Sequence, residues 1–435
     1  MTRNTSKRYP AYQDSGVDWL GKIPAHWDLA KVKRLFRVVN GSTPVSSVPE
    51  YWDGDIVWVT PDDLGRLTFD TIAKGSRNIS ELGHASCATT LVPRGSLVLS
   101  TRAPIGHLAI AGVQLCTNQG CKCLVPRDGD HVRYFYYQLL AARPELRSLG
   151  DGSTFRELGS RKLEGVLLTC PSTEEQRTIA DLLDRETAKI DALIPKKEHL
   201  IELLQEKRTA LISQAVTKGL DPNVPTKDSG IEWLEEIPAH WQVKPLKHMT
   251  EMTNGFGFKP SGWGDQGIPI IRIENLNLGT EFNYTTRRVD PRFEVGYGDL
   301  LFGWSGNRGT SFGPFVWRRR GKYYLNQHIF RLSGYDCDAG WLYWALKGVT
   351  FYVEKQAHGI IGLVHITRKD FGAISLPVVP VDEQRSIAEF LDRETAKIDG
   401  LAAKVSEAID QLREYRTALI SAAVTGKIDV REVAS

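Results

Sequence analysis

Polar side chains that could form hydrogen bonds with nucleic-acid bases recur in predicted turns of two separate regions of the chain. Arginine can bind guanine with two hydrogen bonds, asparagine and glutamine can do so with adenine, and aspartate or glutamate can accept from cytosine. In the first region these residues are Thr60, Asp62, Thr101, Arg102, Asn118, Gln119, Ser153, Thr154 and Arg156. In the second they are Arg272, Glu274, Asn275, Ser305, Asn307, Arg308, Asn326, Gln327, His328, His365 and Arg368. Any one of them is more often a turn former, so the groups carry more weight than their members.

Basic residues also cluster locally, and such clusters are typical of phosphate contacts. Candidates near the first region are Lys31, Lys33 and Arg34; Arg318–Arg320 and Lys322 lie in the second. The net charge of +3 and pI of about 8.4 are too weak to argue for nucleic-acid binding on their own. Each cluster alone is equally consistent with a solvated surface.

The length and composition indicate an ordinary globular protein. A chain of 435 residues, 41 % hydrophobic and 25 % charged, fits two to four domains. It has neither an apolar run of about 18 residues nor a hydrophobic signal segment, so we expect a cytoplasmic location without membrane contact. The six cysteines form no CxxC pair and are expected to be free thiols. The spacing of Cys116, Cys121 and Cys123 argues against a metal site.

Signatures of catalysis are missing from the sequence. No lysine has an acidic residue two positions before it, which removes a pair that many nucleases use to hold Mg²⁺. There is no GxxxxGK[ST], no HExxH and no Asn/Asp-Pro-Pro-Tyr/Phe tetrapeptide. The sequence therefore predicts that this chain is not itself an enzyme.

The elements that must position the polar turns are repeated. Residues Glu175–Thr217 return almost unchanged as Glu383–Thr425, an offset of 208 residues (383 minus 175). Asp14–Trp27 returns as Asp228–Trp241, an offset of 214 residues (228 minus 14). Between these repeats lie two inserts that scarcely resemble one another. A fixed frame around two variable inserts suits a protein that holds two different readers.

The longer repeat is predicted to form two helices that pack on each other. Apolar residues alternate at three- and four-residue steps, as in a coiled coil. Ser172 or Thr173 can cap the first helix, and Gly219 and Gly426 can end the two. Because the halves repeat, a pseudo-twofold axis would run the helices antiparallel. The predicted helix-pairing residues are Leu183, Ile190, Leu193, Leu200, Leu204 and Leu211, with Leu391, Ile398, Leu401, Val405, Leu412 and Leu419.

Pro195 interrupts the first helix pattern, and its counterpart in the second copy is Ala403. Proline removes an i→i−4 hydrogen bond and clashes with the preceding turn, so we expect a kink or break near Ile194. In the shorter repeat, Trp27 and Trp241 are predicted to anchor the core, and His26 and His240 to cap or pack.

Both inserts are predicted to mix strands, turns and short helices, which makes the fold class α+β with a pseudo-twofold internal repeat. The expected strands are 55–60, 96–100, 106–111, 268–273, 299–304 and 312–317, and the expected shorter helices are 132–142 and 340–353. The expected domains are an N-terminal segment with the first insert (1–171), the first long helix (172–220), a linker with the second insert (221–379), and the second long helix with a tail (380–435).

The order of these motifs resembles one known family. The residues that carry the resemblance are the doubled IPAHW segment, the doubled EQR…LDRETAKID…RTALIS helix, and insert phrases such as TNQGCKCLVP and YYLNQHIFRL. Over its whole length the chain is similar to the specificity (S) subunit of type I restriction–modification systems. Individual phrases are loose, whereas the ordered duplication is specific.

The resemblance implies a function and partners. In that family each insert is a target-recognition domain that binds one half of a split double-stranded DNA site in the major groove. The long antiparallel helices separate the two domains, set the spacer and dock two methyltransferase (M) subunits, and restriction (R) subunits can join. S-adenosylmethionine, ATP and Mg²⁺ would then belong to partner subunits, and this chain would hold no cofactor. Unlike inserts imply an asymmetric bipartite site.

Two other interpretations stay open on the residues alone. The chain could be a tandem protein–protein scaffold without DNA specificity, or an enzyme whose active site carries no known motif. Sensitivity of DNA binding to salt separates a DNA reader from a scaffold, since phosphate contacts release counterions.

Overall fold

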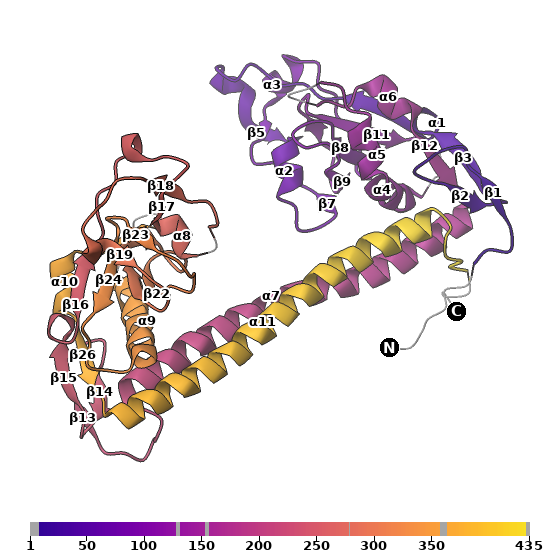
Figure 1. Cartoon of the computed structure of the whole chain (residues 1–435). Helices are drawn as coiled ribbons and strands as arrows, with labels where there is room; N and C mark the ends of the chain where they lie inside the picture. The colour runs from indigo at the N-terminus through magenta and orange to yellow at the C-terminus, as the bar shows by residue number, and fades with distance from the viewer. Residues whose placement is uncertain (1–7, 128–130, 153–155, 278, 357–362, 432–435) are drawn as a thin grey trace. The chain divides into compact units, whose positions relative to one another are not determined.

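The computed structural model describes residues 8–127, 131–152, 156–277, 279–356 and 363–431 (Figure 1). The chain forms two compact units. Unit 1 comprises Met1–Lys196 and Glu407–Ser435, and unit 2 comprises Lys197–Ser406. Each unit contains one insert together with part of both long helices, so the unit boundaries fall inside the helices. The predicted α+β class with mixed inserts, two long helices and an internal repeat is confirmed.

Unit 1 is built on a five-stranded sheet in the order β4-β11-β8-β9-β7. All neighbours are antiparallel except β7 and β9. Three two-stranded pairs, β1-β2, β3-β12 and the parallel β6-β10, surround it. The strands are β1 (Tyr12–Asp14), β2 (Lys22–Pro24), β3 (Asp28–Lys31), β4 (Phe36–Asn40), β5 (Trp52–Ile56), β6 (Trp58–Val59), β7 (Thr71–Ile72), β8 (Leu97–Ser100), β9 (Leu108–Ala111), β10 (Cys116–Thr117), β11 (Cys121–Pro126) and β12 (Leu167–Cys170).

Unit 2 contains two four-stranded sheets, β16-β24-β20-β22 and β18-β17-β23-β19. The pairs β13-β14, β15-β26 and β21-β25 complete it. The strands are β13 (Thr226–Asp228), β14 (Glu236–Pro238), β15 (Gln242–Pro245), β16 (Glu251–Asn254), β17 (Ile268–Ile271), β18 (Asn283–Thr285), β19 (Glu294–Val295), β20 (Leu300–Gly303), β21 (Ser305–Asn307), β22 (Gly313–Val316), β23 (Tyr323–Leu325), β24 (Ile329–Ser333), β25 (Leu363–His365) and β26 (Ser375–Val378).

The short helices of each insert lie between these strands. In unit 1 they are α1 (Val32–Leu35), α2 (Pro61–Gly65), α3 (Glu81–Ala85), α4 (Val132–Ala141), α5 (Arg143–Ser148) and α6 (Ser160–Gly165). In unit 2 they are α8 (Ile273–Leu276), α9 (Ala339–Gln356) and α10 (Arg368–Ala373). Thus α4 and α9 form close to where the sequence predicts them.

The strands of the two units pair in matching registers, although the inserts differ in sequence. Asn40 pairs with Lys122 in unit 1, and Asn254 pairs with Phe330 in unit 2. These partners are shifted by the same 214 and 208 residues that separate the repeats. The parallel pairs agree as well, since Val59 opposite Thr117 corresponds to Ile271 opposite Leu325. The internal repeat therefore extends into the inserts as backbone geometry.

The long helices are α7 (Thr173–Lys218) and α11 (Val381–Val424). Ser172 caps α7, because its hydroxyl accepts from the amide of Glu175 at 3.3 Å. Gly219 and Gly426 follow the helix ends with φ of +73° and +70°, a conformation that glycine adopts without strain. In unit 1 Asp191 pairs with Arg416, and the hydroxyl of Thr169, just before α7, donates to the carbonyl of Val424 at the end of α11, so the two helices run antiparallel. The ion pair Arg208–Asp399 in unit 2 continues the same order.

The sequence predicted a kink or break near Ile194, and the break is wrong, because α7 continues through Pro195 without interruption. Pro195 is exposed. The carbonyl that loses its helical partner belongs to Asp191, which is also exposed, and water can replace the missing donor.

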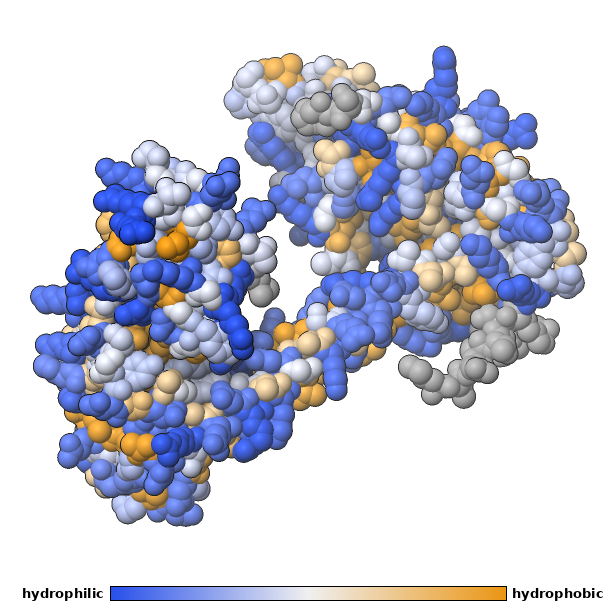
Figure 2. Space-filling view, viewed as in Figure 1, coloured by the Kyte–Doolittle hydropathy of each residue, from blue (hydrophilic) through white to orange (hydrophobic). Residues whose placement is uncertain are grey.

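Each unit has its own core that joins the insert to the helices. Ile179, Leu183 and Ile420 belong to the main cluster of unit 1, and Ile212, Ile387 and Leu391 to that of unit 2. Trp27 and Trp241 are 1 % and 0 % exposed, so both tryptophans are core anchors as predicted. Figure 2 shows the largely hydrophilic surface around these cores, with apolar side chains also reaching the surface along the helices.

Equivalent residues of the two long helices bind the shorter insert helices. The Gln176 side chain accepts from the amide of His131, which precedes α4, and Gln384 accepts from the amide of Asp338, which precedes α9. Asp184 accepts from Arg133 on α4 at 2.6 Å, and its counterpart Asp392 accepts from Trp344 on α9 at 2.9 Å. The repeated helices thus use the same acceptors for unlike inserts.

In the parts of the chain that the structure describes, no helix is long and apolar enough to cross a membrane. The same residues contain no group of three or more His, Cys, Asp or Glu side chains suited to a metal ion. Cys116 forms no disulfide, and burial raises the pKa of its thiol to about 11.

Candidate nucleic-acid interface

Three of the predicted polar turns in unit 2 meet around one cavity. We call them turn cluster 2 and define it as residues 272–275, 304–307 and 326–328. The cavity has a volume of about 530 Å³. Arg272, Glu274, Asn307, Asn326, Gln327 and His328 all line it, together with Phe258 and Trp263. Six residues that were selected from the sequence alone therefore line one cavity, although they belong to three separate turns.

Arg272 is fixed on one wall of this cavity. Its guanidinium lies 4.5 Å from the ring centre of Trp263, donates to Asn283 Oδ1 at 2.7 Å and pairs with Glu274 at 2.9 Å. The backbone amide of Arg272 donates to Asn275 Oδ1 at 2.9 Å, which closes the first turn of α8. These contacts hold a planar, charged donor in place, which favours two-pronged hydrogen bonding.

The turn at residues 326–328 contains polar side chains that shape the turn and one that is exposed. Asn326 is 9 % exposed, and its Oδ1 accepts from the Gln327 amide at 2.8 Å. Gln327 is exposed, and its Nε2 lies 3.2 Å from His328 Nε2. His328 Nδ1 and Trp263 Nε1 are buried and have no partner among the described residues. Gln327 is therefore the side chain of this turn most available to a ligand.

Ser305, Arg308, His365 and Arg368, the other predicted residues on the surface of unit 2, do not line the cavity. Ser305 on β21 pairs with His365 on β25, and the Trp304 ring lies 4.9 Å from the ring of His365. Arg308 donates to the carbonyl of Glu354 on α9 at 2.5 Å, which commits part of its guanidinium. Arg368 is exposed in the first turn of α10.

The corresponding turns of unit 1 meet around Gly120. We define turn cluster 1 as residues 60–63, 101–102 and 118–120. A β-carbon at Gly120 would lie 2.8 Å from Pro61 Cγ, 3.0 Å from Arg102 Nε and 3.2 Å from Asn118 Oδ1. Asn118 Oδ1 accepts from the Gly120 amide at 2.9 Å. Glycine is therefore needed here because three turns approach one another closely.

Asp63 holds the first turn of cluster 1. Its carboxylate accepts from the amide and hydroxyl of Thr60 at 2.8 and 2.7 Å and from the Ser76 amide at 2.8 Å. Burial acts to raise the pKa of Asp63, but these hydrogen bonds outweigh it and hold the pKa below its usual value of 3.8. Asp62, in contrast, is exposed and pairs with Arg66. Sequence reasoning chose Asp62 and missed Asp63, whose part is to shape the turn.

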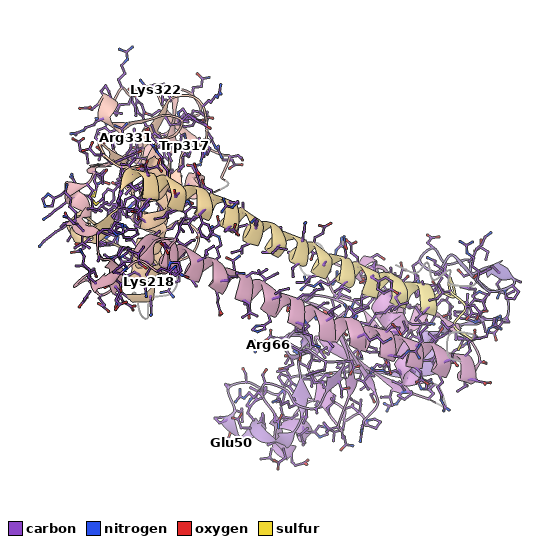
Figure 3. The ribbon with its side chains drawn as sticks, turned by 90° about the horizontal axis from the view of Figure 1, so that it is seen from below. Glu50, Arg66, Lys218, Trp317, Lys322 and Arg331 are labelled. Carbon is purple, nitrogen blue, oxygen red and sulfur yellow. The ribbon has the colours of Figure 1, made fainter. Side chains whose placement is uncertain are left out.

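Other predicted residues of unit 1 lie outside cluster 1. Arg156 is exposed next to Glu157, which is the β-bridge partner of the cluster residue Arg102. Ser153 and Thr154 fall outside the described residues. Lys31, Lys33 and Arg34 are exposed on β3 and α1, and no contact described for the resolved ranges links them to the cluster. Figure 3 labels the charged residues Glu50 and Arg66 in unit 1 and Lys218, Lys322 and Arg331 in unit 2.

The two clusters share one backbone frame. Asn118 N donates to Val59 O at 3.0 Å, and Asn326 N donates to Ile271 O at the same distance. Thr101 N donates to Gly120 O at 2.8 Å, and Trp304 N donates to His328 O at 3.2 Å. Leu158 N binds Thr101 O at 2.9 Å, and Ile366 N binds Trp304 O at 3.0 Å. Capping contacts within residues 60–63 and 272–275 also correspond.

This frame was not evident from the sequence because main-chain hydrogen bonds do not depend on side-chain identity. Two signals for it were present. Asn118-Gln119 recurs as Asn326-Gln327 at the offset of 208 residues, and the Asn40-Gly41 pair recurs as Asn254-Gly255 at 214. Trp263 and Phe258, which line the cavity, carried no comparable signal and were missed.

Comparison with known proteins identifies the family to which the chain belongs. A family model described as "Type I restriction modification DNA specificity domain" matches residues 24–203 and 238–411. The chain therefore belongs to the type I restriction–modification DNA specificity family. The two matches correspond to the two halves of the internal repeat.

Two curated relatives and one solved structure illustrate the similarity. The MjaIX specificity subunit of Methanocaldococcus jannaschii is 35 % identical over 268 residues, which cover 60 % of this chain and 60 % of that relative. The MjaVIII specificity subunit of the same organism is 22 % identical over an alignment of 442 positions, covering 95 % of both chains.

The solved structure concerns complex assembly and conformational transition of the type I R-M system. Its matching chain superposes with a TM-score of 0.67 at 16 % identity, over 92 % of this chain and 98 % of that one. At this identity the match establishes the fold alone. The fold-class prediction and the family resemblance are both confirmed.

Proposed function

We propose that this chain is the non-catalytic DNA-reading subunit of a type I restriction–modification complex, and that each unit reads one half of an asymmetric bipartite site. The observation that supports this most is the pair of turn clusters. They share a backbone frame but differ in most exposed side chains, as two readers of different sequences would. Bidentate side-chain contacts discriminate a base pair by about 1–3 kcal/mol, which is sufficient for sequence reading.

Basic and aromatic side chains around the clusters suit the DNA backbone. In unit 2 the guanidinium of Arg287 lies 4.9 Å from the Phe256 ring, and that of Arg319 lies 4.9 Å from the Phe282 ring. Such stacking orients the charge while leaving donors for phosphate oxygens. We assign these residues to positioning on the duplex and the turn clusters to base contacts.

The long helices are proposed to set the spacer between the half-sites. A helix of 46 residues extends about 69 Å at 1.5 Å per residue, and equivalent faces of a duplex recur about every 34 Å. Inserting about four residues into both helix seams should lengthen the spacer and leave each half-site unchanged. Unchanged spacing would count against this role.

Two methyltransferase subunits are proposed to dock on the helices. Leu193 and its repeat counterpart Leu401 are 41 % and 52 % exposed, one in each unit, as two equivalent partners would need. Both leucines were predicted to pair the helices, and that role stays a prediction. S-adenosylmethionine, ATP and Mg²⁺ are proposed to reside in the partner subunits, with restriction subunits completing the assembly.

The function is tested by sequencing modified bases in DNA from cells that express this chain with its methyltransferase partner. A bipartite motif with unlike halves is expected. Arg102→Ala or Asn118→Ala should alter only the first half, and Arg308→Ala or Asn326→Ala only the second. A substitution that changes both halves would contradict modular reading.

A salt titration of DNA binding by the same complex separates a reader from a scaffold. The affinity of a reader should fall steeply with salt because phosphate contacts release counterions. A complex that binds no DNA would support the scaffold. Turnover by the purified chain alone would instead support an enzyme.

A further inference from the structure

Gln119 and Gln327 occupy the same place in the two turn clusters. Each follows the asparagine whose amide binds the parallel strand pair, and each is exposed. The residue before Gly120 in unit 1 thus corresponds to the residue before His328 in unit 2, at the repeat offset of 208. Both glutamines extend from turns whose backbones make the same hydrogen bonds.

The surroundings of the two glutamine amides also correspond. Gln119 Oε1 accepts from the hydroxyl of Thr43. The equivalent of Thr43 is Gly257, where a β-carbon would lie 3.0 Å from Gln327 Oε1. In both units the segment that contains Thr43 or Gly257 therefore lies next to the amide oxygen of the glutamine. The two glutamine amides thus have the same orientation relative to the surrounding backbone.

Neighbouring positions of the frame carry different chemistry. The bridge partners Arg102 and Glu157 in unit 1 correspond to Ser305 and His365 in unit 2. In the first turn, Thr60 corresponds to Arg272. Gly120 in unit 1 corresponds to His328 in unit 2, so this position carries a side chain in unit 2 only. The frame thus combines one constant exposed side chain with several variable ones.

We infer that Gln119 and Gln327 contact the same base in the two half-sites, and that the differences between half-sites come from Arg102/Ser305, Glu157/His365 and Thr60/Arg272. An amide offers one donor and one acceptor side by side, the pattern that matches adenine N7 and N6. The common base is therefore an adenine. This inference rests on the proposed DNA-reading function.

At the β-bridge, where Arg102 of unit 1 corresponds to Ser305 of unit 2, the bases in the two half-sites are expected to differ. Arg102 can contact a guanine with two hydrogen bonds, whereas Ser305 is too short to do so and offers one hydroxyl. The first half-site is accordingly expected to contain a guanine next to the shared adenine. The second half-site is expected to accept more than one base at that position.

The test uses the full chain in complex with its methyltransferase partner and a DNA library randomised over both half-sites. Gln119→Ala should reduce the preference for adenine at one position of the first half by about ten- to a hundredfold, and Gln327→Ala should do the same in the second half. Arg102→Ser should remove the preference for guanine beside it. Gln205→Ala, an exposed glutamine on α7, is the matched control and should change neither half.

The outcomes distinguish this inference from the function on which it rests. If the unaltered complex selects no sequence, the proposed function fails and the inference fails with it. If the complex selects a bipartite site but the two glutamine variants weaken all sequences equally, the glutamines serve another purpose and the inference alone is overturned. Half-sites without a common base would overturn it as well.

Discussion

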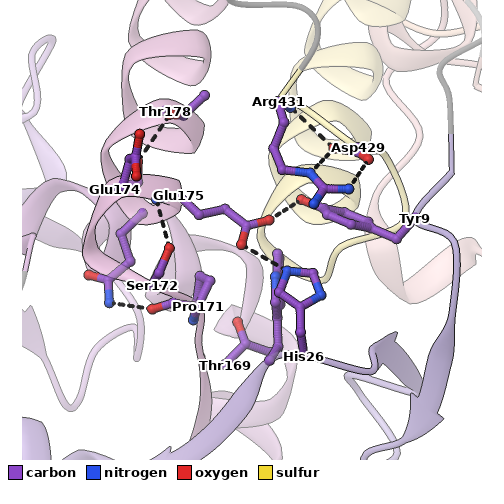
Figure 4. A network of polar contacts seen from close by, with 12 residues as sticks. Tyr9, His26, Thr169, Pro171, Ser172, Glu174, Glu175, Thr178, Asp429 and Arg431 are labelled. Atoms are coloured by element: carbon purple, nitrogen blue, oxygen red, sulfur yellow. Dashed lines mark hydrogen bonds and ion pairs between the residues drawn. The ribbon is translucent and has the colours of Figure 1, made fainter.

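Glu175 and Glu383 occupy the same position in the two copies of the repeat and bind equivalent histidines, but their second partners differ. Glu175 accepts from the hydroxyl of Tyr9 at 2.6 Å and from His26 Nε2 at 3.0 Å (Figure 4). Glu383 accepts from His240 Nε2 at 2.8 Å and from Trp241 Nε1 at 3.0 Å. Tyr9 therefore takes the acceptor that the tryptophan uses in unit 2.

Because Tyr9 occupies this acceptor in unit 1, the buried Trp27 Nε1 has no partner in the described structure. The guanidinium of Arg431 lies 4.9 Å from the Tyr9 ring and pairs with Asp429. The first and last described segments of the chain thus contribute to one polar network.

Tyr9→Phe should lower the free energy of unfolding of unit 1 by about 1–3 kcal/mol near neutral pH, because the buried Glu175 carboxylate loses a donor. Burial, reinforced by the bond to Glu175, raises the pKa of Tyr9 above its usual 10.0. The neutral hydroxyl is the stabilising form, so its contribution is complete below pH 10 and is lost as the pH rises toward the raised pKa. Denaturant unfolding between pH 7 and 11 measures the difference between variant and parent.

The difference in the free energy of unfolding between Tyr9→Phe and the parent should decrease in the alkaline range and not in the acidic range. Tyr415→Phe is a suitable control, since Tyr415 is 58 % exposed. A Tyr9→Phe deficit that is constant up to pH 11 would contradict a buried, hydrogen-bonded hydroxyl.

Gly41→Ala and Gly255→Ala should each impair one half-site. A β-carbon would lie 2.1 Å from Asn118 O at Gly41 and 2.0 Å from Asn326 O at Gly255, where backbone atoms cannot yield cheaply. The turn that carries Gln119 or Gln327 must then shift. Modified-base sequencing should show weakened selection in the first half for Gly41→Ala and in the second for Gly255→Ala. At Gly400, where no atom lies within 4 Å, alanine should be harmless.

Arg416→Gln should destabilise helix pairing more than Arg208→Gln, although the two arginines occupy equivalent ion pairs. Arg416 binds Asp191 through two hydrogen bonds of 2.8 and 3.0 Å. Arg208 Nε lies 3.1 Å from Asp399 Oδ1 but makes no aligned hydrogen bond. Because both pairs are partly exposed, we expect losses of at most about 1 kcal/mol. Thermal unfolding at low and high salt measures them, and equal losses would contradict the difference in geometry.

Lys347→Met should stabilise unit 2 near pH 7. Burial, together with the positive charge of Arg208, lowers the pKa of Lys347 to about 8, while its Nζ lies 5.4 Å from the ring centre of Phe315. The unfolded chain binds a proton more tightly than the folded chain, so the stability of the parent rises between pH 8 and its ordinary pKa of 10.5.

The gain from Lys347→Met is therefore expected to be about 1–3 kcal/mol at neutral pH and to disappear near pH 10.5. Unfolding by urea across this range provides the measurement. Lys355→Met, further along α9, is the control for removing a positive charge. A gain that is independent of pH would mean that packing and not charge is responsible.

Sequence patterns anticipated the large elements better than the small ones. The seam through Leu183, Ile190 and Leu391 predicted the long helices because their apolar faces repeat with helical period. Strands such as β8 and β9 fell within about two residues of expectation because Pro and Gly mark their ends. The break expected at Pro195 did not occur: the carbonyl of Asp191 that loses its donor is exposed to water, and the sequence does not state this exposure.

The candidate site was anticipated in its members but not in its organisation. Arg272, Asn326 and Gln327 were selected one by one for their chemistry, and only the fold places them around one cavity. Asp63 and Asn275 were harder to separate from base-contacting residues, because polar side chains that shape a turn have the same composition as those that bind a ligand. The hydrogen bonds that Asp63 and Asn275 accept from backbone amides show that these side chains shape their turns.

The main-chain bonds that hold each turn cluster have an evolutionary consequence. They do not involve the exposed side chains, so under the proposed DNA-reading function exchanging Arg102 for serine or Ser305 for arginine is expected to alter what is recognised at little expense in folding. A DNA reader of the proposed kind would acquire new targets through a few surface substitutions in one half while the other half keeps its preference. Diversity of recognition is thereby separated from the risk of misfolding.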